Sequence, residues 1–144
     1  MKTFITSLIV AILFTSTAAF ATVPKSAKRS NVAAINYTLD RYTDALSKGQ
    51  VADLDHLFSE QFNQRFVQRE KGASFGKKQL VNFLKKHRNI QQNCETNYRI
   101  LEETEGMAIA KVEMKYKDFS RIDYVTISHS NEGYQISQVV STFE

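Results

Sequence analysis

The sequence is poor in the residue patterns that build many functional sites. It has one cysteine, so no disulfide can form within the chain and stability must come from an apolar core. It shows no glycine-rich phosphate loop, no Ser-His-Asp order and no paired-carboxylate motif. A zinc site needs three or four converging ligands, whereas His56, His87 and His129 fall on separate elements without paired spacing. Neither a metal site nor a cofactor is therefore predicted.

The chain also lacks a strong charge of one sign. Its 144 residues carry a formal net charge of +4, and acidic residues are interspersed among the basic ones. Domains that bind nucleic acid concentrate Lys and Arg on one face, so no nucleic-acid partner is predicted. Hydrophobic residues make up 42% of the chain, which is sufficient for one domain with a real core.

An apolar run at the N-terminus is too short to span a membrane. Phe4–Phe14 follows the positively charged Lys2 and precedes an Ala-Phe-Ala pattern that ends at Ala21. This order is typical of a cleaved signal peptide, whereas a spanning helix needs about 20 apolar residues. We therefore expect residues 1–21 to be a signal peptide. The mature protein is expected to be exported, periplasmic or secreted, without a stable membrane anchor.

Hydrophobic periodicity predicts helices in the first half of the mature chain. Ile35, Leu39, Tyr42 and Leu46 recur at the spacing of one helical face. A glycine follows this helix where a left-handed cap residue would stand. A flexible leader is predicted at 22–30 and one domain at 31–144. The expected helices span 30–48 (starting at Ser30 or Asn31), 50–58 and 77–88. Gly49 separates the first two helices. A short strand is expected to begin near Asn63.

The pattern changes to a period of two in the second half of the chain. Alternating apolar residues such as Ala108, Ala110 and Val112 indicate strands, and short loops separate the alternating runs. Four antiparallel strands in succession are predicted, without an internal repeat or a second domain. The expected strands span 93–101, 108–116, 121–129 and 134–143. The expected core residues on the helices are Leu39, Leu46, Leu54, Phe58, Phe83 and Leu84.

The order of these elements resembles the nuclear transport factor 2-like superfamily. The helix-break-helix stretch RYTDALSKGQVADLDHLF, residues 41–58, carries the resemblance, which covers roughly Val32–Phe143. It implies an α+β, cystatin-like fold in which three N-terminal helices pack on a curved antiparallel sheet and form a cone with a pocket. Exported bacterial members of this layout include a lumazine-binding group and SnoaL-like proteins. Because this fold hosts unrelated functions, the resemblance implies no single activity.

The sequence is also similar to ketosteroid isomerases at two places. Residues 41–58 match their helix pair, and the dipeptide Ile122-Asp123 matches a strand that carries a buried acid. In those enzymes a tyrosine and an acid form the oxyanion hole, and a separate aspartate abstracts the proton. The resemblance places the tyrosine at Tyr42 and the acid at Asp123. The base position falls on Phe66, which cannot accept a proton, so isomerase chemistry is not predicted.

Asp123 is the most informative candidate for a binding site. It shares a strand face with Val125, and an aspartate on a core-facing side needs a partner. That partner is either a ligand in the pocket or a salt bridge, for example with Arg121 or Lys111. As a pocket pair, Tyr42 and Asp123 would each donate a hydrogen bond to a ligand, which requires Asp123 to keep its proton. The candidate pocket residues are Tyr42, Phe66, Asp123, Val125 and Gln138.

Three functions remain open from the sequence. The first is an exported domain that binds a small apolar or aromatic molecule in a hydrophobic cone, favoured by sixteen Phe and Tyr residues and the missing base. The second is a dehydratase, isomerase or cyclase that uses Tyr42 and Asp123. The third is a homodimeric interaction module, in which an outer sheet face bearing Ile122, Tyr124 and Tyr134 meets a second copy.

Processing of the N-terminus provides a direct test of the predicted signal peptide. The mature protein is expected to begin at Thr22, because cleavage follows a small-x-small pattern. N-terminal sequencing of protein exported by a bacterial host measures this. An Ala21→Arg variant is expected to remain uncleaved, since the site then lacks a small residue. Exported wild-type protein that begins at Met1 would contradict the prediction.

Overall fold

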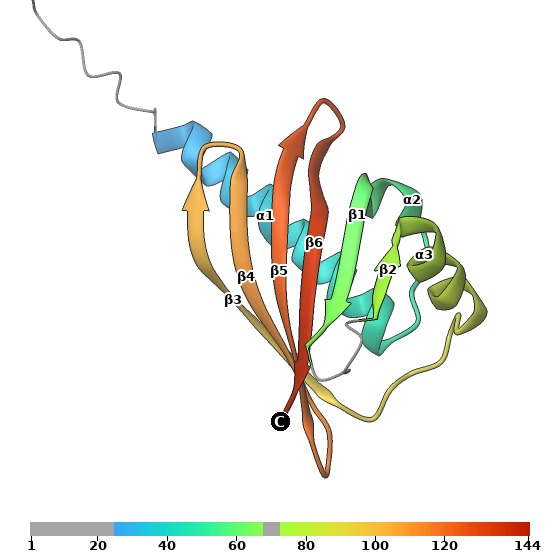
Figure 1. Cartoon of the computed structure of the whole chain (residues 1–144). Coiled ribbons are helices and arrows are strands. Elements are labelled where there is room, and N and C mark those ends of the chain that lie inside the picture. The colour runs from blue at the N-terminus through green and yellow to red at the C-terminus, as the bar shows by residue number, and fades with distance from the viewer. Residues whose placement is uncertain (1–24, 68–72) are drawn as a thin grey trace, which may run out of the picture.

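The structure of the protein, a computed structural model, describes residues 25–67 and 73–144. Within these residues, six strands form one curved sheet, and the helices lie along one side of it (Figure 1). None of the described helices is long and apolar enough to cross a membrane. The expected signal peptide, residues 1–21, lies outside the described residues. The helices are α1 (Lys25–Ser47), α2 (Leu54–Leu57) and α3 (Lys77–Lys86), and the strands are β1 (Phe58–Phe66), β2 (Ser74–Gly76), β3 (Glu95–Thr104), β4 (Met107–Lys115), β5 (Ser120–Ser130) and β6 (Gly133–Phe143).

Helix α1 begins earlier than the hydrophobic pattern predicts. The expected start is Ser30 or Asn31, whereas the helix begins at Lys25, directly after the single proline of the sequence. Lys, Ala and Arg are good helix formers, so this basic segment continues the helix. Residues 25–30 of the segment predicted as a leader therefore belong to α1. The apolar face is as predicted, with Leu39 fully buried at its centre.

A glycine ends α1 and allows a distant loop to approach it closely. Gly49 has φ of +65°, which is the left-handed conformation predicted for the helix cap. A side chain here would place its Cβ 2.7 Å from the backbone nitrogens of Asn89 and Ile90. The Asn89 N–H also donates to the Gly49 carbonyl at 2.9 Å. The predicted cap is confirmed, and its contact with the segment after α3 ties the two helices together.

The sheet and the helices are not ordered as the sequence predicts. The expected block of three N-terminal helices is not confirmed, because α2 is a single turn and both β1 and β2 precede α3. The left-handed conformation of Asp53 precedes α2, and Phe58 already pairs with Ile136 of β6, which leaves no room for the predicted helix at 50–58. The strand order is β2-β1-β6-β5-β4-β3. Because β1 pairs with β6 in parallel, the sheet is not wholly antiparallel.

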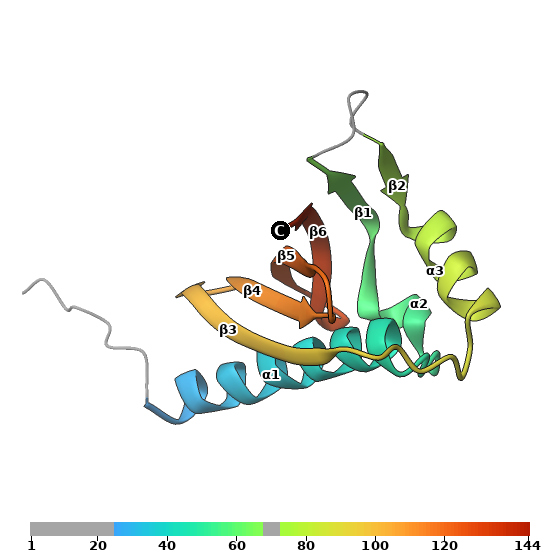
Figure 2. The same ribbon diagram turned by 90° about the horizontal axis from the view of Figure 1, so that it is seen from below.

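The four C-terminal strands form the predicted antiparallel meander. Each of β3, β4 and β5 pairs with the next strand along the chain, and Asp123 of β5 lies between Val112 of β4 and Ser141 of β6. Figure 2 shows that β1 and β2 stand at a steep angle to β3 and β4, so the sheet is strongly bent. The result is an α+β fold with a curved, unclosed sheet, and α1 and α3 lie on its concave side.

A hydrophobic core fills the space between α1 and the concave face. Val125 contributes from the sheet, and it is fully buried. The prediction for Phe83 is wrong, because its side chain is 54% exposed. Helix α3 turns Leu80, Val81 and Leu84 inward instead, which leaves Phe83 at the edge. The other predicted helix-side core residues are confirmed as buried: Leu39, Leu46, Leu54, Phe58 and Leu84.

A truncation at the centre of the α1 face tests this packing. Leu39→Ala is expected to lower the free energy of unfolding by about 2–5 kcal/mol, because it leaves a cavity in a fully buried position. Tyr37→Ala, on the same helix at a side chain that is 64% exposed, is the matched control. Its effect is expected to stay within about 0.5 kcal/mol. Urea unfolding measures both, and equal losses would contradict the assigned helix face.

Candidate functional site

A cavity of about 430 Å³ lies on the concave side, between α3 and the end of the sheet. Helix α1 closes its floor with one leucine, β1 and β2 each supply a phenylalanine, and α3 covers it with three side chains. Most of the lining is therefore apolar or aromatic, and an arginine from β5 enters it. The lining residues are Leu46, Gln64, Phe66, Phe75, Gln79, Leu80, Phe83 and Arg121.

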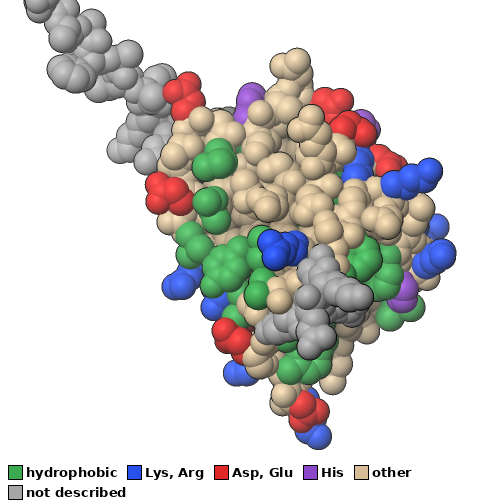
Figure 3. All heavy atoms as spheres, in the orientation of Figure 1, with side chains coloured by type: hydrophobic (Ala, Val, Ile, Leu, Met, Phe, Trp, Pro, Cys, Tyr) green, Lys and Arg blue, Asp and Glu red, His purple; other side chains and the backbone are tan. Residues whose placement is uncertain are grey.

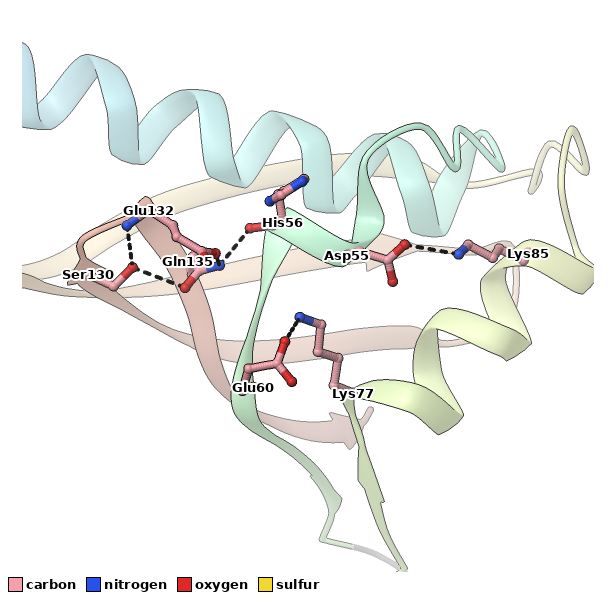
Figure 4. A network of polar contacts seen from close by, with 8 residues as sticks. All are labelled: Asp55, His56, Glu60, Lys77, Lys85, Ser130, Glu132 and Gln135. Carbon is pink, nitrogen blue, oxygen red and sulfur yellow. Dashed lines mark hydrogen bonds and ion pairs between the residues drawn. The ribbon is translucent and has the colours of Figure 1, made fainter.

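Surface contacts hold the covering helix α3 and the short helix α2 in place (Figure 4). Lys85 Nζ lies 3.1 Å from Asp55 Oδ2, and Lys77 Nζ lies 2.5 Å from Glu60 Oε1. Gln135 Nε2 of β6 donates to a backbone carbonyl of α2 at 3.0 Å. Both carboxylates of the ion pairs are largely exposed, so each pair adds little stability. They link α3 to α2 and to β1 at the surface.

A buried polar network lies directly behind the cavity. The Tyr42 hydroxyl of α1 donates to Asp123 Oδ2 at 2.7 Å. Arg121 binds the same carboxylate with two nitrogens, Nε to Oδ1 at 3.0 Å and Nη2 to Oδ2 at 2.9 Å. Tyr42 and Asp123 are fully buried, whereas the Arg121 side chain is 17% exposed. The network therefore joins α1 to β5 and ends at the cavity with a guanidinium.

The protonation of this network follows from its burial and its charges. Burial raises the pKa of Tyr42 well above its ordinary value of 10.0, and the negative charge of Asp123 raises it further. Burial lowers the pKa of Arg121, but the Asp123 carboxylate outweighs this and the net direction is upward. Tyr42 thus stays neutral and Arg121 stays charged. The salt bridge considered for Asp123 is present, and in this arrangement its carboxylate accepts hydrogen bonds rather than donating one to a ligand.

The structure brings some of the predicted pocket residues together and separates others. Phe66 lines the cavity. Tyr42 and Asp123 lie next to one another behind Arg121, and neither of them lines the cavity. Val125 belongs to the hydrophobic core. Gln138 is exposed and lines a polar groove on the other face of β6, so it is not part of this cavity.

Several lining residues were not among those predicted from the sequence. Arg121 stands two positions before Asp123, so the alternation of a strand already places the two on one face. Gln64 stands two positions from Phe62 and from Phe66, so it shares one strand face with them in the same way. The sequence predicted only part of the strand that contains these residues. The sequence did not indicate that residues of β2 and α3, such as Phe75, line a site, because their position depends on how the arm made of β1, β2 and α3 folds over the rest of the sheet.

A second cavity of about 190 Å³ adjoins the first and shares Leu46, Phe83 and Arg121 with it. Aromatic rings surround this region. The rings of Phe66 and Phe143 stack with centroids 6.0 Å apart, and further aromatic side chains continue the row. Two neighbouring spaces with aromatic walls therefore meet at one arginine. The continuing ring contacts join Phe66 to Phe75, Phe119 to Phe143 and Tyr116 to Phe119.

The outer face of the sheet carries part of the surface predicted for self-association. Hydrophobic side chains gather on the lower part of the face seen in Figure 3. Tyr124 is 42% exposed and lies opposite Asp123, as strand alternation predicts. Ile122 is buried to 1% exposure, and Tyr134 packs against the core, so neither is a free surface residue. Assembly through this face stays a prediction.

Comparison with known families agrees with this architecture. A family model described as "Putative lumazine-binding" matches residues 30–143, which is most of the chain. The chain belongs to this family. The family match confirms the lumazine-binding-like group implied by the helix-break-helix stretch. A comparison with curated protein sequences finds no match.

Solved structures similar to this member of the family share its fold. A nuclear transport factor 2-like protein of unknown function from Silicibacter pomeroyi is 13% identical with a TM-score of 0.66, covering 81% of this chain and 98% of that one. A similar protein from Shewanella baltica is 13% identical with a TM-score of 0.64, covering 85% and 98%. A cystatin-like fold protein from Burkholderia xenovorans is 12% identical with a TM-score of 0.61, covering 79% and 92%. The likeness shows that the chain shares the fold of these nuclear transport factor 2-like and cystatin-like proteins.

Alkaline pH tests the buried tyrosine of this network. Because the folded state raises the pKa of Tyr42, its contribution to stability is complete below about pH 10, where an unfolded tyrosine ionises, and falls as pH rises further. Tyr42→Phe is expected to cost about 1.5–3 kcal/mol at neutral pH through the lost hydrogen bond to a carboxylate. The wild-type advantage should then shrink by about 1.4 kcal/mol per pH unit above pH 10.

Urea unfolding of both proteins between about pH 7 and pH 11 measures this difference. The contributions of the other tyrosines to the pH dependence cancel, because both proteins contain them. One of these is Tyr98: its burial and its hydrogen bond to Asp40 raise its pKa to about 12. A wild-type advantage that stays constant across this range would show that the Tyr42 hydroxyl is not the buried neutral donor described above.

Proposed function

We propose that this protein is a small-molecule binding domain whose cavity takes an apolar or aromatic ligand. The observation that carries the proposal is the cavity of about 430 Å³, walled mainly by apolar side chains with a few polar groups. Ligand sites are typically concave, largely apolar and about 300–1,000 Å³ in volume, with a small number of polar groups that orient the ligand. The cavity meets each of these criteria.

The walls favour a flat ring as the ligand. Phe66 and Phe75 approach each other edge to face at 5.9 Å between centroids, and Phe83 stands at the edge of the same space. Aromatic side chains gain from offset or edge contacts with another ring. The family is described as lumazine-binding, and lumazine is a flat bicyclic heterocycle. That description supports a planar ligand of modest size for this chain.

An enzymatic role that uses Tyr42 and Asp123 has less support. A general acid, base or oxyanion donor must reach the reacting atoms. The Tyr42 hydroxyl is occupied by the Asp123 carboxylate, and neither side chain lines the cavity. Binding is therefore the function that this geometry favours. We further propose that the domain acts after export, on the basis of the signal-peptide pattern at residues 1–21.

Methyl NMR with a neutral aromatic probe tests the binding function. Phenylnaphthylamine, whose fluorescence rises in apolar surroundings, is expected to bind and to shift the methyl signals of Leu46 and Leu80, which line the cavity. Leu101, an exposed leucine on β3, is the internal control and should not move.

The same substitution at two leucines provides the matched variants. Leu80→Trp is expected to fill the cavity and weaken binding, while Leu101→Trp adds the same bulk elsewhere and should leave binding unchanged. Urea unfolding verifies that each variant folds. The proposed function is contradicted if wild-type Leu46 and Leu80 respond neither to this probe nor to its sulfonated analogue, whatever the variants do.

A further inference from the structure

Arg121 is the only charged side chain, among the described residues, that lines the larger cavity. It also lines the smaller cavity, so its side chain stands where the two spaces meet. Its Cζ lies 5.7 Å from the centroid of the Phe66 ring, which is close enough for a cation–π contact. A ligand in either space would therefore meet this cation beside an aromatic wall.

The guanidinium is fixed in advance and keeps donors for a second partner. Asp123 engages Nε and Nη2, so Nη1 takes part in neither of these two contacts. A guanidinium carries five N–H groups, and the two bonds use two of them. Because Asp123 is fully buried and the Arg121 side chain is 17% exposed, the cation rather than the carboxylate faces the cavity. A rigid donor loses little conformational entropy when a ligand binds.

The charge at the cavity surface is positive although the ion pair as a whole is neutral. Neither cavity has an acidic side chain among its described lining residues. Asp123 balances the charge of Arg121 only from the far side, and an electrostatic interaction weakens with distance. In an apolar space water screens poorly, so the nearer charge dominates. An anionic group here would form charge-assisted hydrogen bonds, which are about twice as strong as neutral ones.

Two glutamine amides complete the polar part of the lining. Gln64 is 3% exposed, and among the described residues its amide makes one hydrogen bond, from Nε2 to Ser141 Oγ at 3.0 Å. A buried amide that uses one of its four hydrogen-bonding positions has capacity for a ligand. Gln79 Oε1 accepts from the Gly76 N–H at 3.0 Å, which leaves its amino group as a donor. The lining thus offers mostly donors, as an anion requires.

We propose that the ligand is an organic anion, with an aromatic or conjugated body and one acidic group that binds the Arg121 guanidinium. This inference rests on the proposed function. It adds the charge of the ligand and the residue that binds its acidic group. The rings of Phe66, Phe75 and Phe83 hold the body, and Gln64 orients it. Asp123 is a positioning residue, since it acts through Arg121.

A matched pair of probes separates the charge from the aromatic body. Anilinonaphthalenesulfonate and phenylnaphthylamine share one aromatic skeleton and differ by the sulfonate group. The wild-type protein is expected to bind the sulfonate at least about tenfold more tightly, as one charge-assisted contact allows. Fluorescence titration gives both dissociation constants. Methyl shifts at Leu46 and Leu80 verify that each probe occupies the cavity rather than the outer surface of the protein.

Two variants that differ at one position assign this preference to Arg121. In Asp123→Asn the guanidinium loses its counter-charge, and the preference for the sulfonate is expected to be kept or to increase. In the double variant Arg121→Met/Asp123→Asn the cation is gone, and the preference is expected to fall close to one. Arg121→Met alone is avoided, because it would leave Asp123 as an unpaired buried charge. Urea unfolding confirms that both variants fold.

Each outcome decides between the two proposals. Equal wild-type affinity for both probes, or a preference that survives in the folded double variant, overturns the anion proposal and leaves the binding function standing. If neither probe shifts Leu46 and Leu80, both proposals fail. Should the double variant not fold, the wild-type comparison decides alone, because equal affinity for the two probes contradicts the role of Arg121.

Discussion

The hydrogen-bonded link from Tyr42 through Asp123 to Arg121 is the constraint on which the site depends. A carboxylate inside an apolar core is strongly unfavourable unless it is paired and hydrogen-bonded. Here it accepts one bond from α1 and two from its own strand. The same link holds α1 in one position across the sheet and aims the guanidinium at the cavity. An energetic requirement of the core therefore also sets the chemistry of the cavity wall.

The cavity exists because the arm made of β1, β2 and α3 bends away from the rest of the sheet (Figure 2). Helix α3 packs inward with Leu80, Val81 and Leu84, yet its fourth large apolar side chain, Phe83, stays 54% exposed. The Gly49 contact holds the segment after α3 close to α1. A space remains where this arm, α1 and β5 meet. Side chains of the arm and of β5 line that space.

Membership of the lumazine-binding family establishes the fold of this chain and says less about its chemistry. The three solved structures compared above are 12–13% identical, and a shared fold does not imply a shared function. The specific features of this chain are the arginine at the cavity, the two amides beside it and the phenylalanine at the base position of the isomerases. These features favour recognition of a ligand over proton transfer.

The sequence by itself determined α1, its cap and the strands of the meander. The α1 stripe, the Gly49 cap and the alternating strands of the meander all follow from periodicity, which is a local property of the chain. The tertiary structure alone decided which polar groups meet. Tyr42 and Asp123 were both identified as candidates, but that they satisfy each other, that Gln138 faces away and that Phe83 stays exposed depend on the angle of α1 and α3 to the sheet. Such angles arise from packing between distant segments, which no local pattern records.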